Sequence, residues 1–139
     1  MRKGFTLIEI MLVILIVGVI GVIAVPKITS AILKTKEKSN IANLSSIREA
    51  LRLYYSDNSA YPTDDLSSLY PKYISKIPEL DIPNSNHTKT DSVRTSNSSS
   101  DITDSGMWGY VNVSTSADFG HVFIDCTHVD LSGKRYCDY

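Results

Sequence analysis

Apolar residues dominate the start of the chain and then give way to a mixed sequence. Residues 5–25 form a run of 21 positions in which Glu9 is the only charged side chain. As an α-helix this run would be roughly 31 Å long, which matches the hydrocarbon thickness of a bilayer. A charge costs on the order of 2.5–3.5 kcal/mol at the centre of such a helix and less near its end. The pattern predicts a membrane-spanning helix that keeps Glu9 for a function.

From Pro26 onward the polar fraction rises, and apolar residues recur at helical spacing. The residues expected on the buried face are Leu44, Ile47, Leu51, Tyr54 and Tyr55. The polar cluster at 56–59 predicts the end of the helix. We therefore expect one long helix, with residues 5–26 apolar on all sides and residues 27–58 packing one face against a globular head.

Residues 59–139 are expected to form that head. The segment 61–78 predicts a turn and a short helix, capped by Thr63 or Asp64, followed by an extended piece rich in proline. The residues expected to pack on the long helix are Leu66, Leu69, Tyr73 and Ile77.

Residues 84–106 have a very polar composition. Seventeen of these 23 residues are Ser, Thr, Asn or Asp. Such a segment has few apolar side chains to bury, so the sequence predicts a mobile surface loop without regular structure.

Alternation of apolar and polar residues returns after this loop. Strands are expected at 107–113, 119–126 and 134–137, the last following a turn at Ser132 and Gly133. The expected fold class is α+β, with a long N-terminal helix packed against a small antiparallel sheet.

Length and charge narrow the picture. One hundred and thirty-nine residues suit one domain, and the formal net charge is −1, which does not suggest a general nucleic-acid binder.

The two cysteines, Cys126 and Cys137, lie near the C-terminus. If the small head lies outside the cytoplasm, a disulfide between them is favoured over two free thiols.

Candidate catalytic or metal-binding patterns are sparse. No nucleophile elbow or glycine-rich phosphate loop appears in the sequence, so no catalytic residue and no cofactor are predicted. His121 and His128, with Asp125 between them, offer a weak zinc pattern, and isolated surface histidines are the alternative. Four aspartates are candidate calcium ligands: Asp101, Asp104, Asp118 and Asp125. Their spacing does not match the dense loop of oxygen ligands that is typical of calcium sites.

The N-terminus resembles that of type IV prepilins and of the related pseudopilins. The resemblance rests on the sequence from Lys3 to Glu9 (KGFTLIE), on the short basic leader, on the apolar run and on Pro26. It implies a leader of residues 1–4, cleavage by prepilin peptidase between Gly4 and Phe5, and N-methylation of Phe5. It also implies that Glu9 acts in assembly, by neutralising the N-terminal ammonium of a neighbouring subunit's Phe5.

The family resemblance implies a structural protein rather than an enzyme. Such a subunit is held in the bacterial inner membrane with its head outside the cytoplasm and is then polymerised with copies of itself. Its expected partners are the inner-membrane assembly platform and minor pilins. The leading hypothesis is a type IV pilus subunit for adhesion, motility or DNA uptake. The second is a major pseudopilin of type II secretion, a class that binds calcium. The third is a signal-anchored binding or enzymatic domain.

Overall fold

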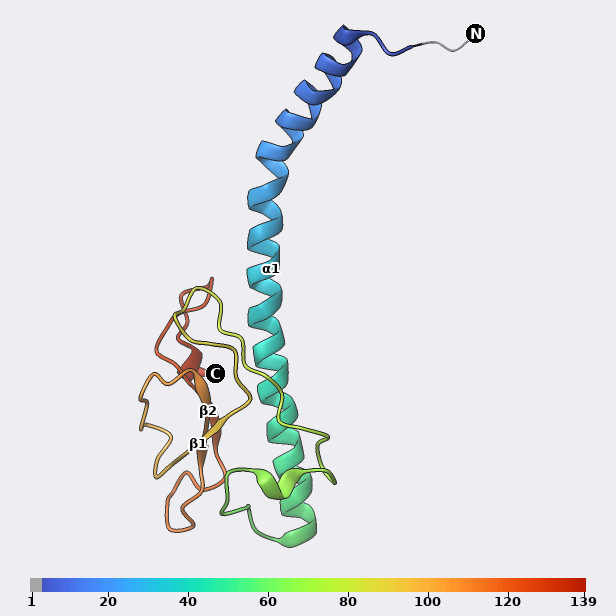
Figure 1. Cartoon of the computed structure of the whole chain (residues 1–139). Helices are drawn as coiled ribbons and strands as arrows, with labels where there is room; N and C mark the ends of the chain where they lie inside the picture. Colours follow the sequence, from blue (N-terminus) through green and yellow to red (C-terminus); the bar gives the residue numbers. More distant parts are fainter. Residues whose placement is uncertain (1–3) are drawn as a thin grey trace. The chain divides into compact units, whose positions relative to one another are not determined.

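A computed structural model describes residues 4–139, and the first three residues of the expected leader lie outside the described part. The elements are a helix α1 (Leu7–Asn58), a 3-10 helix η1 (Ser67–Leu69), three short strands and a C-terminal 3-10 helix η2 (Tyr136–Asp138) (Figure 1). The chain divides into two compact units, residues up to 35 and residues 36–139, and α1 contributes to both.

The first unit consists of the apolar part of α1. The helix has an 18-residue window with a mean hydropathy of 3.1, none of it buried within the protein, so its length and composition suffice to cross a membrane. Side chains such as Leu12, Leu15 and Val22 are exposed. Pro26 lies inside the helix without ending it. The prediction of one long helix with an apolar first half is confirmed.

The second unit is the head, and its core forms around the C-terminal part of α1. The buried stripe of this helix contains Leu44, Ile47, Ala50 and Leu51. These side chains pack with apolar side chains of the following segments, including the predicted Leu66, Leu69 and Ile77. The predicted Tyr73 is partly buried against this core and meets Tyr54 edge to face at 5.4 Å between ring centroids. Tyr55, which was expected on the buried face, is 46% exposed.

The sheet has three strands in the order β1-β2-β3, namely β1 (Val93–Ser96), β2 (Met107–Val111) and β3 (Val122–Asp125). Strands β1 and β2 run parallel, with Val93 opposite Trp108, whereas β2 and β3 run antiparallel, with Trp108 opposite Ile124. The α+β class is confirmed, but the prediction of a purely antiparallel sheet is wrong. The parallel pair arises because β1 comes from the polar segment that was expected to be a loop.

The expected third strand at 134–137 does not form. One isolated bridge joins Val129 to Arg135, and η2 then follows. The Asp130 carboxylate accepts hydrogen bonds from the Ser132 and Lys134 backbone N–H groups, which closes a tight turn. The chain then curls so that Tyr136 is fully buried.

Candidate functional site

The expected processing junction lies in a short non-helical segment before α1. Gly4 and Phe5 are exposed, and the Phe5 side chain is 76% exposed. The helix begins two residues later, at Leu7. Gly4 and Phe5, the residues on either side of the expected cleavage position, therefore lie exposed outside the helix.

Glu9 takes part in a local motif that closes the start of the helix. Its Oε2 atom accepts hydrogen bonds from the backbone N–H and the hydroxyl of Thr6, both at 3.1 Å, and the Glu9 N–H donates to Thr6 Oγ1 at 3.3 Å. This reciprocal pair is a capping box, in which a Thr at the N-cap and a Glu three residues later satisfy each other's free N–H groups. The spacing Thr-x-x-Glu was visible in the sequence, but our sequence reasoning assigned Glu9 to assembly alone.

A second polar centre lies in the head, at the end of β3. Asp125 is fully buried, and its carboxylate accepts a hydrogen bond from Arg94 Nε at 2.8 Å. It also accepts bonds from the Thr103 N–H at 2.7 Å and hydroxyl at 2.6 Å, and from the Ser105 hydroxyl at 2.5 Å. Burial acts to raise the pKa of Asp125, but these hydrogen bonds and the Arg94 charge outweigh it and hold the pKa below its usual value.

This centre anchors part of the polar segment 84–106, which has few apolar side chains. The segment wraps around the Asp125 carboxylate, Ser96 is buried, and Arg94 joins β1 to the following turn by contacting Asp101. The prediction of a loop without regular structure is wrong at β1, and the rest of the segment forms turns, bends and one isolated bridge. Hydrogen bonds to a buried charge add to the few hydrophobic contacts of the segment, such as that of Val93 with the core.

The four candidate calcium ligands are divided among three different groups of partners. Asp101 and Asp125 share the Arg94 guanidinium, at 3.1 Å and 2.8 Å. Asp118 accepts hydrogen bonds from Ser99, through its N–H at 3.0 Å and its hydroxyl at 2.7 Å. The fourth, Asp104, joins a different group of side chains. The positive charge beside Asp101 and Asp125 is thus supplied by an arginine.

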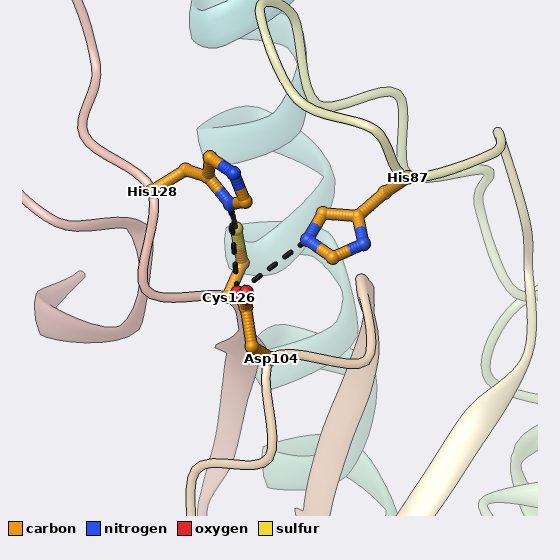
Figure 2. A group of neighbouring side chains, drawn as sticks. All are labelled: His87, Asp104, Cys126 and His128. Carbon is orange, nitrogen blue, oxygen red and sulfur yellow. Dashed lines mark hydrogen bonds and ion pairs between the residues drawn. The ribbon is translucent and has the colours of Figure 1, made fainter.

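The group around Asp104 contains His128, which the sequence had offered as part of a weak zinc pattern, and Cys126, which it had assigned to a disulfide. Figure 2 shows His87, Asp104, Cys126 and His128 with their side chains pointing toward one another, and one ligand atom of each lies within 4.8 Å of all the others. His121 is not in this group, and its ring stacks on Phe123. The suggested zinc pairing of His121 with His128 and Asp125 is therefore wrong, because β3 carries the intervening carboxylate into the Arg94 centre.

The pKa values of Asp104 and Cys126 are shifted in opposite directions in this cluster. Asp104 accepts a hydrogen bond from the Thr127 N–H at 2.7 Å, and this bond is the main cause that lowers the pKa of Asp104 to about 2. Burial raises the pKa of the Cys126 thiol to about 12, and the nearby Asp104 carboxylate adds to the effect. At neutral pH Asp104 is therefore an ionised carboxylate and Cys126 a protonated thiol when no ion is bound to them.

Both cysteines are free thiols in the structure, so it does not contain the predicted disulfide. Their backbones are nevertheless adjacent, since the Cys137 N–H donates to the Cys126 carbonyl at 3.1 Å. Cys126 is buried and Cys137 is partly exposed. A bond between them stays a prediction.

Comparisons with known proteins support the interpretation of the N-terminus. Residues 1–25 match the profile of the prokaryotic N-terminal methylation motif. The chain is 37% identical over 67 residues to type II secretion system core protein G of Vibrio cholerae, and 39% identical over 64 residues to the protein of that name from Klebsiella pneumoniae. These alignments cover 47% and 46% of this chain, and the chain spans about half the length of these relatives, 46% in both cases. No solved structure gives a significant match. The chain thus carries a prokaryotic N-terminal methylation motif and has homologues among the core G proteins of type II secretion, as its resemblance to type IV pilins and pseudopilins indicated.

Proposed function

We propose that this chain is the major pseudopilin of a type II secretion system, a structural subunit that polymerises with copies of itself. The observation that carries the proposal is the 36–39% identity to three type II secretion core G proteins. The methylation motif and the exposed apolar helix agree with it. This was the second of our hypotheses from the sequence, and the relatives favour it over the pilus.

In this proposal the chain has two successive locations. The first part of α1 is held in the inner membrane, with the head outside the cytoplasm. After extraction by the inner-membrane assembly platform, the same apolar surface packs against other helices in the filament. Residues such as Leu12, Leu15 and Val22, which are exposed in the single chain, supply the apolar area that would drive this packing.

Processing prepares the end that assembles. Cleavage between Gly4 and Phe5 by prepilin peptidase creates a new N-terminal amine two residues before α1 begins at Leu7, and methylation then modifies that amine. Glu9 belongs to the same turn, held by its capping box with Thr6. A carboxylate fixed in this way can meet the ammonium of a neighbouring subunit's Phe5, and in an apolar setting that attraction is far stronger than in water.

The type IV pilus is the alternative for the same architecture, with surface attachment, motility or DNA uptake as the outcome. Minor pilins would be its further partners. The methylation motif on which the pilus hypothesis rests is common to pilins and pseudopilins, so it favours neither. The distinction therefore needs an experiment in the native host.

The test is deletion of the gene followed by two assays on the same strains. We expect loss of secreted proteins from the culture medium, with their accumulation in the periplasm, and no change in surface pili. Restoring the wild-type gene should restore secretion, and a Gly4→Leu variant, in which the junction cannot be cut, should not. Normal secretion together with loss of surface pili would replace the proposal with the pilus. Normal secretion and normal pili would refute both filament hypotheses.

A further inference from the structure

The cluster of His87, Asp104, Cys126 and His128 lies outside everything that the proposed filament function uses. Its members come from three segments. His87 belongs to a hairpin closed by the bridge between Leu80 and Thr90, Asp104 precedes β2, and Cys126 and His128 follow β3. Three segments that are distant in sequence therefore place four potential ligands at one point of the head.

We propose that these four residues form a zinc site, with Nε2 of His87, Oδ1 of Asp104, Sγ of Cys126 and Nδ1 of His128 as the ligands. The first argument is the ligand set. Zinc is bound in proteins by imidazole nitrogen, thiolate sulfur and carboxylate oxygen. Calcium and magnesium take oxygen ligands instead, and this cluster offers one carboxylate only.

The second argument is the geometry. A tetrahedral zinc ion with Zn–N and Zn–O bonds of about 2.0–2.1 Å and a Zn–S bond of about 2.3 Å holds neighbouring ligand atoms about 3.3–3.6 Å apart. Three edges of the cluster have such lengths. Cys126 Sγ lies 3.3 Å from His128 Nδ1, which lies 3.5 Å from Asp104 Oδ1, and that oxygen lies 3.4 Å from His87 Nε2. Three of the six distances between ligand atoms thus match a zinc tetrahedron, and the other three are at most 4.8 Å.

The third argument is an unsatisfied atom. His87 Nε2 is buried and makes no hydrogen bond, because its contact with Asp104 is close in distance but poorly directed. A buried polar atom without a partner is costly, so a cluster held by hydrogen bonds alone leaves this cost uncompensated. A metal ion bound at Nε2 would remove it.

The surroundings hold two of the ligands in place. Gly106, at φ +72°, packs against the His87 ring so closely that a Cβ atom there would lie 2.4 Å from His87 Cγ. The Thr127 N–H fixes the Asp104 carboxylate at 2.7 Å, the kind of outer hydrogen bond that orients metal ligands. The side chains of Asp104 and His128 are 38% and 37% exposed, which leaves a path for the ion to enter.

The test uses the full-length chain, purified in detergent with a phosphine reductant. We expect one zinc per chain by elemental analysis, a rise in melting temperature with added zinc by linkage, and, with cobalt as the probe, the absorption of a tetrahedral site with a thiolate-to-metal charge-transfer band. Cys126→Ser should abolish the charge-transfer band and weaken zinc binding by more than the roughly 10–100-fold that changes outside the ligand shell cost. Cys137→Ser is the matched control, because it also removes one thiol and the same predicted disulfide yet should leave zinc binding unchanged.

A second matched pair guards against misfolding of the buried Cys126 variant. His128→Gln replaces a half-exposed ligand and should weaken zinc binding, whereas His121→Gln, outside the cluster, should not. Fluorescence of Trp108 reports whether each variant is folded. The proposal is overturned if the reduced wild-type chain binds no stoichiometric zinc. It is equally overturned if Cys137→Ser loses as much zinc as Cys126→Ser, or if the two histidine variants behave alike.

Discussion

Replacing Asp125 by alanine should destabilise the head more than a change at any exposed carboxylate. The Asp125 side chain has no exposed surface and accepts hydrogen bonds from Arg94, Thr103, Asp104 and Ser105. Its removal leaves the hydrogen-bond donors of two neighbouring turns without an acceptor. It also leaves the Arg94 side chain, which is 19% exposed, with a weaker partner. Breaking a buried charge pair from one side costs about 3–5 kcal/mol, which is a large share of the roughly 5–15 kcal/mol by which domains are stable.

Asp101 provides the matched control, because it contacts the same guanidinium from the surface. Its side chain is 52% exposed and lies 3.1 Å from Arg94. Exposed ion pairs contribute about 0–1 kcal/mol, so Asp101→Ala should have a small effect. Both variants remove one carboxylate from the same arginine, so the difference between them reports the burial of Asp125 together with its additional hydrogen bonds from Thr103 and Ser105.

The assay is urea unfolding of the full-length chain in detergent, followed by fluorescence. The protein has a single tryptophan, Trp108, which is fully buried and donates from its ring N–H to the Pro78 carbonyl at 2.8 Å. Its emission therefore reports the head alone. A loss below about 1 kcal/mol for Asp125→Ala, or equal losses for both variants, would refute the assignment of Asp125 as the centre that anchors part of residues 84–106.

The same carboxylate predicts the sign of a pH dependence. Because the folded pKa of Asp125 lies below its unfolded value of about 3.9, its contribution is fully present above pH 5 and is lost as the pH falls through the folded pKa. Wild-type stability should therefore decline in acid, and Asp125→Ala should decline less over the same range. Parallel acid profiles would contradict this reasoning.

Three further predictions concern the termini and the ions. Glu9→Gln should preserve the helix cap, which Gln can also form, yet stop filament assembly as completely as Glu9→Ala; filaments from Glu9→Gln cells at wild-type yield would show that capping alone matters. The resemblance to major pseudopilins implies calcium binding, but this chain should depart from that pattern: calcium should not raise its melting temperature relative to chelator, because Arg94 already supplies the cation beside Asp125; a clear calcium-dependent rise would contradict this expectation. Metal-free protein oxidised in air should yield the linked Cys126–Cys137 peptides by non-reducing mapping, whereas zinc-loaded protein should keep both cysteines reduced, so that both are alkylated once the chain is unfolded and the metal removed; equal linkage in the two samples would count against a shared sulfur.

The sequence by itself determined the features that depend on near neighbours along the chain. The apolar run up to Val25, the long helix, the buried stripe with Leu44 and Leu51, and the α+β class all follow from periodicities of a few residues. The methylation motif is likewise a contiguous string, and a match over residues 1–25 confirms it. Even the capping box of Thr6 and Glu9 was readable, since its partners are three positions apart.

Only the tertiary structure decided what happens in the polar half of the head. A segment of Ser, Thr, Asn and Asp has no hydrophobic period, so its order depends in part on one buried carboxylate, Asp125, that lies on another strand. The parallel pairing of β1 with β2 and the meeting of His87 with His128 depend on the same long-range contacts. Residue spacing along the chain carries no information on such contacts, because hydrogen bonds and metal ligands are set by distance in space.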